Sequence, residues 1–477
     1  MTEPHLNLIA GRWQEAQALA ENRNPSDPSD LIGLYARGGA EDVALAVAAA
    51  RAAQPAWAKA SPQLRADVLR RTGDILLARV EEMGRLLARE EGKTLAEAKG
   101  EALRAAQLFH FYAGEPVRAP GEKHASIRDG VEVEVTREPL GVVGLITPWN
   151  FPIAIPAWKT APALAAGNAV VLKPADLTPG CAHLLAQILT EAGCPPGVFN
   201  LVMGRGSEIG AALVAHPDVA AISFTGSERV GRGIALGCAQ AMKKVQLEMG
   251  GKNPMVVTAK ADIDLAVGAC LNGAFFSTGQ RCTASSRLIV EKPVLAEFTD
   301  KLVAAMTALR IGDPLDPATQ IGPVVSEAQL SGNLDYVRLA GEEGCEVVGG
   351  QRLDRPGSFQ APALFLGARN TMRVAREEIF GPCAAVIAAT DFDEAVAIAN
   401  DTSFGLSSGI CTGSLKEAAE FKRRSKAGMV MVNLPTAGVD YHVPFGGRGA
   451  SSLGGREQGR MAMDFYTSVK TAYTFAG

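Results

Sequence analysis

Cys282 lies in a segment that leaves its thiol little cover. A glycine and two polar residues precede it in Gly279–Thr283, and a threonine follows it. A structural cysteine is usually buried in an apolar helix or strand, as we expect for Cys238 and Cys270. A thiolate beside a guanidinium is instead a nucleophile, and Arg281 is the adjacent residue. Both readings stay open from this segment alone.

Glu248 is the one carboxylate in the apolar segment Val245–Gly251, which is typical of a strand ending in two glycines. Burial of an unpaired carboxylate raises its pKa, because the charged form loses its hydration. A carboxyl group with a raised pKa suits a general base. The alternative is a glutamate held in an ion pair at the end of a strand.

Asn150 lies between two prolines in Thr147–Pro152, directly after an apolar run at 141–146. Open α/β sheets bind ligands at the carboxyl ends of their strands. A side-chain amide fixed at such a place can donate a hydrogen bond to a developing oxyanion. A turn asparagine without chemistry is the alternative.

Further motifs follow other predicted strands. Phe224–Ser227 precedes a predicted helix start, where free N–H groups can hold a pyrophosphate, although the segment is neither a GxGxxG nor a Walker loop. Lys173–Asp176 follows the run 169–172, and its lysine fits either a ribose contact or a solvated loop. The segments 377–382 and 443–447 combine charge or proline with an aromatic ring and glycine, and singly they are turns.

The elements that position these motifs form two α/β series. Helical periodicity predicts helices over 40–60, 62–91 and 97–113. Short apolar runs followed by turn residues predict buried parallel strands at 141–146, 169–172, 198–202 and 221–224, and then at 254–257, 286–290, 346–348, 384–387 and 428–433. This pattern predicts doubly wound parallel sheets. The alternating segments 131–137 and 465–473 predict exposed strands that pair with each other.

Composition excludes several classes of protein. A chain of 477 residues predicts about three domains of roughly 150 residues. The net charge of −4 and the lack of a basic stripe argue against a nucleic-acid partner. No long apolar run and no signal-like start argue against a membrane, so we expect a cytoplasmic protein. The eight cysteines and six histidines have no ligand-like spacing, so we expect reduced thiols and no metal.

Seven motifs in order resemble those of the aldehyde dehydrogenase superfamily: TPWNFP, KPAD, FTGS, LEMGG, GQRCT, EEIFGP and VPFGG, over residues 147–447. The resemblance extends to the N-terminal helices and the C-terminal strand. It implies an α/β fold with a Rossmann-type cofactor domain, a catalytic α/β domain and a small β oligomerisation element, and hence a homodimer or homotetramer. The implied bounds are 1–118 with 140–247, then 248–447, and then 119–139 with 448–477.

The resemblance also implies residue roles. Cys282 is the expected nucleophile, Glu248 the general base, and Asn150 with the Cys282 N–H the oxyanion hole. The expected cofactor contacts are Trp149, Lys173, Asp176, Gly226, Ser227, Met249, Glu378 and Phe380. Arg281, beside the nucleophile, is our candidate for binding a substrate carboxylate, and Phe445 is the candidate for the substrate wall.

Residues 431–448 and 456–459 are most similar to the branch that oxidises α-ketoglutaric semialdehyde (2,5-dioxovalerate) to 2-oxoglutarate. Succinate semialdehyde dehydrogenase, a less selective aldehyde dehydrogenase and, from another class, a cysteine esterase or thioesterase are the alternatives. Asp176 replaces the glutamate common in NAD-preferring relatives, which leaves room for a 2′-phosphate and favours NADP over NAD. Residues 449–454 depart from the family's usual Lys-x-Ser-Gly at the mouth of the substrate site.

Overall fold

The computed structural model describes residues 3–477 and contains an eight-stranded sheet that carries most of the predicted strand-end motifs. In spatial order its strands are β19 (Ser452–Leu453), β11 (Lys244–Glu248), β10 (Val219–Thr225), β7 (Val142–Ile146), β8 (Ala169–Lys173), β9 (Phe199–Leu201), β1 (Asn7–Ile9) and β2 (Arg12–Gln14). The stretch from β11 to β9 is parallel, as predicted. The edge strands β19, β1 and β2 join antiparallel, and β1 and β2 were not predicted.

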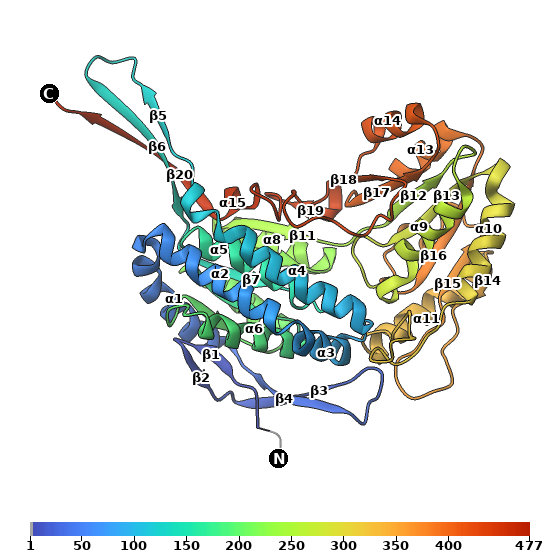
Figure 1. Ribbon diagram of the computed structural model, residues 1–477, viewed down its shortest axis with the longest axis horizontal. Helices are drawn as coiled ribbons and strands as arrows, with labels where there is room; N and C mark the ends of the chain where they lie inside the picture. The colour runs from blue at the N-terminus through green and yellow to red at the C-terminus, as the bar shows by residue number, and fades with distance from the viewer. Residues whose placement is uncertain (1–2) are drawn as a thin grey trace.

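Helices cover both faces of this sheet, so its strands are buried on both sides. The helices are α1 (Ala40–Lys59), α2 (Pro62–Ala78), α3 (Val80–Glu91), α4 (Leu95–Ala113), α5 (Ala154–Ala165), α6 (Pro179–Glu191), α7 (Ala211–Ala215) and α8 (Glu228–Gln240). Along β7, Val143 and Leu145 pack in one core with α2 to α6, whereas Val142 and Ile146 pack in another with α1, α7 and α8. The predicted doubly wound, Rossmann-type arrangement is confirmed (Figure 1).

The prediction of one helix over 62–91 is wrong. The chain leaves the helical path at Arg79, which ends α2 and precedes α3. Glu81 and Glu82 lie in the first turn of α3, where acidic side chains stabilise a new helix N-terminus. The predicted helix at 97–113 begins earlier, at Leu95, because Thr94 and Glu97 form a capping box.

A second, seven-stranded sheet follows in the chain. Its spatial order is β14 (Glu346–Gly349), β15 (Ala363–Leu366), β16 (Cys383–Ala389), β13 (Ser285–Glu291), β12 (Asn253–Val257), β17 (Ser407–Cys411) and β18 (Met429–Val432). All neighbours are parallel except β14 with β15. Its helices are α9 (Ile263–Phe275), α10 (Lys292–Thr307), α11 (Glu327–Glu342), α12 (Arg373–Arg376), α13 (Phe392–Asn400) and α14 (Leu415–Arg424). The second predicted series is confirmed with β15 and β17 added, except that the prediction of a buried parallel strand at 346–348 is wrong: β14 is an edge strand, antiparallel to β15, and none of its residues is buried.

Three strands form an arm that extends from the body of the molecule (Figure 1). They are β5 (Glu122–Ala125), β6 (Val131–Pro139) and β20 (Thr467–Phe475). Antiparallel pairing of β6 with β20 sets Val135 opposite Thr471, so the predicted partnership of these two segments is confirmed. The remaining elements are the hairpin β3 (Ala18–Arg23) with β4 (Leu31–Arg37), and the short helix α15 (Ala462–Phe465).

Candidate active site

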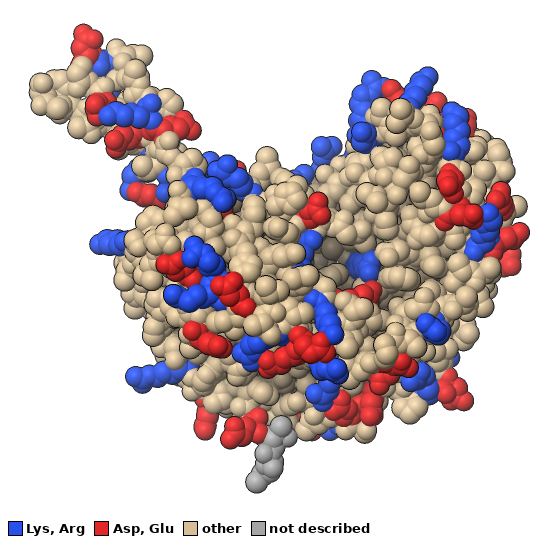
Figure 2. All heavy atoms as spheres, in the orientation of Figure 1, with Lys and Arg blue, Asp and Glu red and all other residues tan. Residues whose placement is uncertain are grey.

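The predicted base and the predicted nucleophile are held by different sheets. Glu248 is the last residue of β11, and residues 249–252 carry the chain directly into β12 of the second sheet. Asn253 begins β12, and its Nδ2 donates hydrogen bonds to the carbonyl oxygens of Cys282 at 2.8 Å and Ala284 at 2.9 Å. The Cys282 backbone is therefore fixed to the second sheet. Figure 2 shows the surface hollowed between the two parts of the molecule.

The loop before the nucleophile has a strained backbone. Ser277, Thr278 and Gly279 all have positive φ, at 50°, 56° and 65°. A Cβ at Gly279 would lie 2.1 Å from the Gly381 carbonyl oxygen, so only glycine fits there. Side chains in left-handed conformations are costly and persist where the surroundings impose them, commonly at functional sites. The strain leads the chain into the turn that presents Cys282.

The Cys282 thiol is half-buried and lines a cavity of about 390 Å³. Burial, together with the charges of Glu378 and Glu248, raises its pKa to about 12. Stabilisation of a thiolate by Arg281 stays a prediction, and the guanidinium is paired with Glu97. These surroundings favour the thiol over the thiolate.

Glu248 is 1% exposed, and its two carboxylate oxygens have different surroundings. Oε2 accepts a hydrogen bond from the Ser452 hydroxyl at 2.5 Å, while Oε1 has no partner among residues 3–477. A Cβ at Gly446 would lie 2.6 Å from Oε1, so this glycine leaves the oxygen uncovered. Burial raises the pKa of Glu248 well above its usual range, and the charge of Glu457 adds to this, as the sequence predicted. The alternative of an ion-paired glutamate fails, because no cation lies within ion-pair distance in the described chain.

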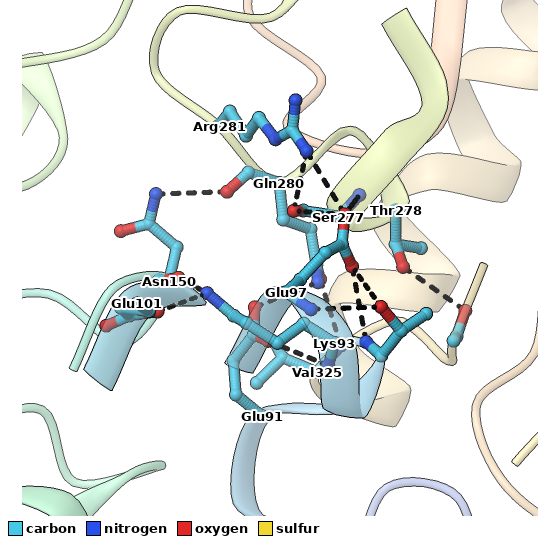
Figure 3. Close-up of polar contacts among 12 residues, drawn as sticks. Glu91, Lys93, Glu97, Glu101, Asn150, Ser277, Thr278, Gln280, Arg281 and Val325 are labelled. Atoms are coloured by element: carbon cyan, nitrogen blue, oxygen red, sulfur yellow. Dashed lines mark hydrogen bonds and ion pairs between the residues drawn. The ribbon is translucent and has the colours of Figure 1, made fainter. Parts of the chain in front are cut away.

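Asn150 is tied to the nucleophile loop by its side chain and to a buried lysine by its backbone (Figure 3). Its Nδ2 donates to the Gln280 carbonyl at 3.0 Å, which uses one of the two amide N–H bonds. Its own carbonyl accepts a hydrogen bond from Lys93 Nζ at 2.7 Å, and Lys93 pairs with Glu101 at 2.6 Å. The Asn150 side-chain amide is thus bonded to a residue two positions before Cys282, and its second N–H remains free to donate.

Arg281 lies in the same cavity but is already paired. Its guanidinium donates to Glu97 Oε1 at 3.1 Å and to the Ser277 hydroxyl at 2.9 Å (Figure 3). Burial lowers the pKa of Arg281, and the charge of Glu97 opposes that shift. Binding of a substrate carboxylate by Arg281 stays a prediction, and Glu97 would compete with it.

Phe445 is 5% exposed and lines the cavity that holds Cys282, and its role as a substrate wall stays a prediction. Its ring lies 5.4 Å from that of Trp158. Arg104 of α4 is a further lining residue that sequence reasoning did not single out. The cavity volume lies within the range of about 300–1,000 Å³ that is usual for small-molecule sites.

A larger groove of about 930 Å³ runs along the carboxyl ends of the parallel strands. Trp149, Lys173, Asp176, Gly226 and Ser227 all line it, so five predicted cofactor contacts share one surface. Ser227 precedes α8 without capping it through its side chain, so the first N–H groups of this helix stay available for an anion. Burial lowers the pKa of Lys173, and its Nζ lies 3.5 Å from Asp176 Oδ1. These residues fit a dinucleotide with its pyrophosphate at α8.

The other three predicted cofactor residues lie elsewhere. Glu378 and Phe380 line a small cavity with Gly279 and Arg281, not the large groove. Glu378 Oε1 accepts from the Gly251 N–H at 2.9 Å, and burial raises the pKa of Glu378 to about 7. Phe380 has a φ of 60° and stacks edge-on against Trp149, with ring centres 5.3 Å apart. Trp149 lines the groove and Phe380 lines the small cavity with Gly279, so this aromatic pair lies between the groove and the nucleophile loop.

Met249 is buried against α8 rather than exposed in the groove, since a Cβ at Gly231 would lie 2.4 Å from its sulfur.

Within residues 3–477, no three His, Cys, Asp or Glu side chains gather as metal ligands would. In the same part of the chain, no helix combines the length and apolar character that crossing a bilayer requires.

Several residues of this site gave no recognisable pattern in the sequence. Lys93, Glu97 and Asn253 fix the nucleophile loop, and Ser452 orients Glu248. The capping pattern at Thr94 and Glu97 could have located the start of α4 but not the contact of Glu97 with Ser277. These partners are distant in sequence, so only the fold brings them together.

Comparisons with known proteins agree with this geometry. The family model "Aldehyde dehydrogenase family" matches residues 13–472. An alpha-ketoglutaric semialdehyde dehydrogenase of Bacillus subtilis (strain 168) is 43% identical and aligns over 98% of each chain. An NAD-dependent aldehyde dehydrogenase of Sinorhizobium meliloti is 37% identical, with a TM-score of 0.97 over 100% of this chain and 96% of that one. An NADP-dependent enzyme of E. coli is 36% identical, with a TM-score of 0.96 over 99% and 98%. The chain therefore belongs to the aldehyde dehydrogenase family.

Proposed function

We propose that this protein oxidises 2,5-dioxovalerate, the semialdehyde of α-ketoglutarate, to 2-oxoglutarate with NADP as the preferred dinucleotide. The observation that carries the proposal is the cavity of about 390 Å³, which places the Cys282 thiol, an apolar wall and arginine side chains around one small space. A carboxylated aldehyde has an aldehyde carbon that can react with the thiol at one end and a carboxylate that can pair with an arginine at the other. The similarity to the Bacillus subtilis semialdehyde dehydrogenase supports the same substrate.

The residues of the chain divide the reaction between them. Cys282 gives its proton to solvent water in the cavity and its sulfur adds to the aldehyde carbon, which places a negative charge on the aldehyde oxygen. The second N–H of Asn150 and the backbone N–H of Cys282 donate to that oxygen. A dinucleotide bound in the large groove would supply the acceptor for the hydride that leaves the carbon, so that a thioester on Cys282 remains. Glu248 then takes a proton from the water that releases the acid and frees the sulfur.

A substrate panel tests this proposal. We expect kcat/KM with NADP to be highest for 2,5-dioxovalerate, lower for succinate and glutarate semialdehydes, and lowest for acetaldehyde. Equal values across the panel would reject the substrate assignment while leaving the family membership intact. Turnover of esters or thioesters without added dinucleotide would favour a hydrolase instead.

Asp176 provides a test of dinucleotide choice. Its side chain is 60% exposed at the end of β8 and leaves space where a longer carboxylate would repel a 2′-phosphate. We expect Asp176→Glu to lower the ratio of kcat/KM for NADP to that for NAD by about tenfold, a change of about 1.4 kcal/mol. Asp176→Asn, which keeps the length and removes the charge, is the control and should not lower the ratio. An unchanged ratio in Asp176→Glu contradicts the assignment.

The arm formed by β5, β6 and β20 is the proposed site of homo-oligomer formation. Val469, Tyr473 and Phe475 lie on β20 with more than half of each side chain exposed, an apolar row that a second copy can cover. We expect Val469→Asp with Tyr473→Asp to lower the mass measured by size-exclusion chromatography with light scattering. Lys470→Asp on the same strand is the control, and an unchanged mass in the double variant contradicts this role.

A further inference from the structure

Two helices present matching stripes of side chains to the cavity that holds Cys282. From α4 the stripe is Glu97, Gly100, Glu101 and Arg104, and from α5 and the residues before it the stripe is Phe151, Ala154, Ile155 and Trp158. Both follow the spacing i, i+3, i+4, i+7, which places side chains on one face of a helix. One wall of the cavity is therefore charged, and the other is apolar.

Arg104 differs from the other charged groups on its wall. Glu97 is paired with Arg281, and Glu101 is paired with Lys93. Arg104 has no carboxylate within ion-pair distance in residues 3–477, and its one hydrogen bond goes to the Gln458 side-chain oxygen at 2.9 Å. The charge of the exposed Asp440 raises the pKa of Arg104, but burial outweighs it and lowers that pKa overall. Of the two arginines that line the cavity, Arg104 is thus the one without an ion-pair contact in the described residues.

Gln458 holds this guanidinium at a structural cost. It is 1% exposed and has a φ of 57°, a left-handed backbone that is unfavourable for a side chain of this size. Its neighbour Glu457 is buried in an ion pair with Lys159, which fixes the segment. A strained residue that positions a free arginine at the edge of a cavity indicates binding of an anion.

Trp158, on the apolar wall, adds a second unused donor. Its side chain is 8% exposed, and its indole Nε1 has no hydrogen-bond partner in the part of the chain that the structure describes. A buried N–H without an acceptor is costly, and sites that bind ligands commonly leave such donors free for them. An α-keto acid offers a carboxylate and an adjacent carbonyl oxygen, and so can accept from both groups.

We propose that Arg104 binds the terminal carboxylate of the substrate, and that the Trp158 indole N–H donates to the neighbouring 2-oxo oxygen. This inference rests on the proposed function and assigns the selectivity of that site to residues other than Arg281. The aldehyde end then reaches Cys282, and the methylene groups lie along Phe151 and Ile155.

The first experiment replaces Arg104 with methionine and compares 2,5-dioxovalerate with pentanal, an uncharged aldehyde of equal chain length. We expect kcat/KM for 2,5-dioxovalerate to fall about 30-fold, chiefly through KM, since loss of one partner of a desolvated charge pair has an effect of this size. Turnover of pentanal should change less than about twofold, because uniform binding of the apolar part is retained. Lys99→Met, also on α4 but paired with Glu81, is the matched control and should change neither value.

The outcomes separate the two proposals. If the wild-type enzyme does not prefer 2,5-dioxovalerate to pentanal, the proposed function is wrong. If it does, and Arg104→Met keeps that preference or Arg281→Met alone loses it, the role of Arg104 is wrong. Should Arg104→Met fail to fold, Arg104→Gln provides the same comparison, and inhibition of pentanal oxidation by 2-oxoglutarate should weaken in parallel.

Trp158→Phe tests the second contact, because it removes the N–H and keeps an aromatic ring. We expect a loss of about tenfold in kcat/KM for 2,5-dioxovalerate and little change for glutarate semialdehyde, which has the same carbon chain without the 2-oxo group. Equal losses on both substrates would show that the ring contributes only packing, and the contact with the 2-oxo oxygen would be rejected.

Discussion

Cys282→Ser is expected to lower kcat for every aldehyde by at least about 10⁴-fold, because the whole reaction passes through this sulfur. A hydroxyl has almost the size of a thiol but ionises far less readily. The side chain is half-buried beside an open cavity, so the substitution should leave the fold unchanged. Turnover of 2,5-dioxovalerate and dinucleotide binding by fluorescence are the two measurements, and only the first should be lost.

Cys194 offers a matched control for this substitution. It is also half-buried, and burial likewise raises its pKa to about 12, but it lies beyond α6 and away from the cavity. Cys194→Ser should therefore retain parental turnover. Oxidation of aldehydes at the parental rate by Cys282→Ser would contradict the proposed chemistry altogether.

Glu248→Gln is expected to separate the two halves of the reaction. Reduced dinucleotide should still form in the first turnover, since hydride transfer does not need the carboxylate. Steady-state turnover should fall by about 10²- to 10⁴-fold, the usual contribution of a general base. Rapid mixing measures the first phase, and continuous assay measures the second. Equal loss of both phases would assign Glu248 to an earlier step.

Ser452→Ala gives a finer test of the same residue through pH. The Ser452 hydroxyl lowers the pKa of Glu248 against the effect of burial, so its removal should raise that pKa further. Because the base acts as a carboxylate, the rising limb of the pH–kcat profile should move to higher pH in the variant. In the wild type this limb should itself be alkaline, because burial raises the pKa values of both Glu248 and Cys282. A shift to lower pH would contradict the assignment.

The sequence predicted those parts of the site that depend on local patterns. Apolar runs and their turns located the strands, and parallel strands bring their carboxyl ends together, so Lys173, Asp176, Gly226 and Ser227 share a groove. The apolar setting of Glu248 was enough to predict its raised pKa. Local patterns could not show that Arg281 would pair with Glu97, which is distant in the chain and neutralises it.

The same limit explains the other departures. Arg104 and Gln458 are separated by 354 positions, so no spacing rule connects them. The break at Arg79 has no proline or glycine to mark it, and the apolar periodicity continues from Leu76 to Met83 across it. The edge strands β1 and β2 are too short to show a period.

The division of the active residues between two sheets has a mechanical consequence. Glu248 is anchored to the first sheet through β11 and Ser452, and Cys282 is anchored to the second through Asn253. Residues 249–252 join the strands that carry these anchors. A rotation of one sheet relative to the other would therefore change the distance between the Glu248 carboxylate and the Cys282 sulfur, on which hydrolysis of the acylated enzyme depends.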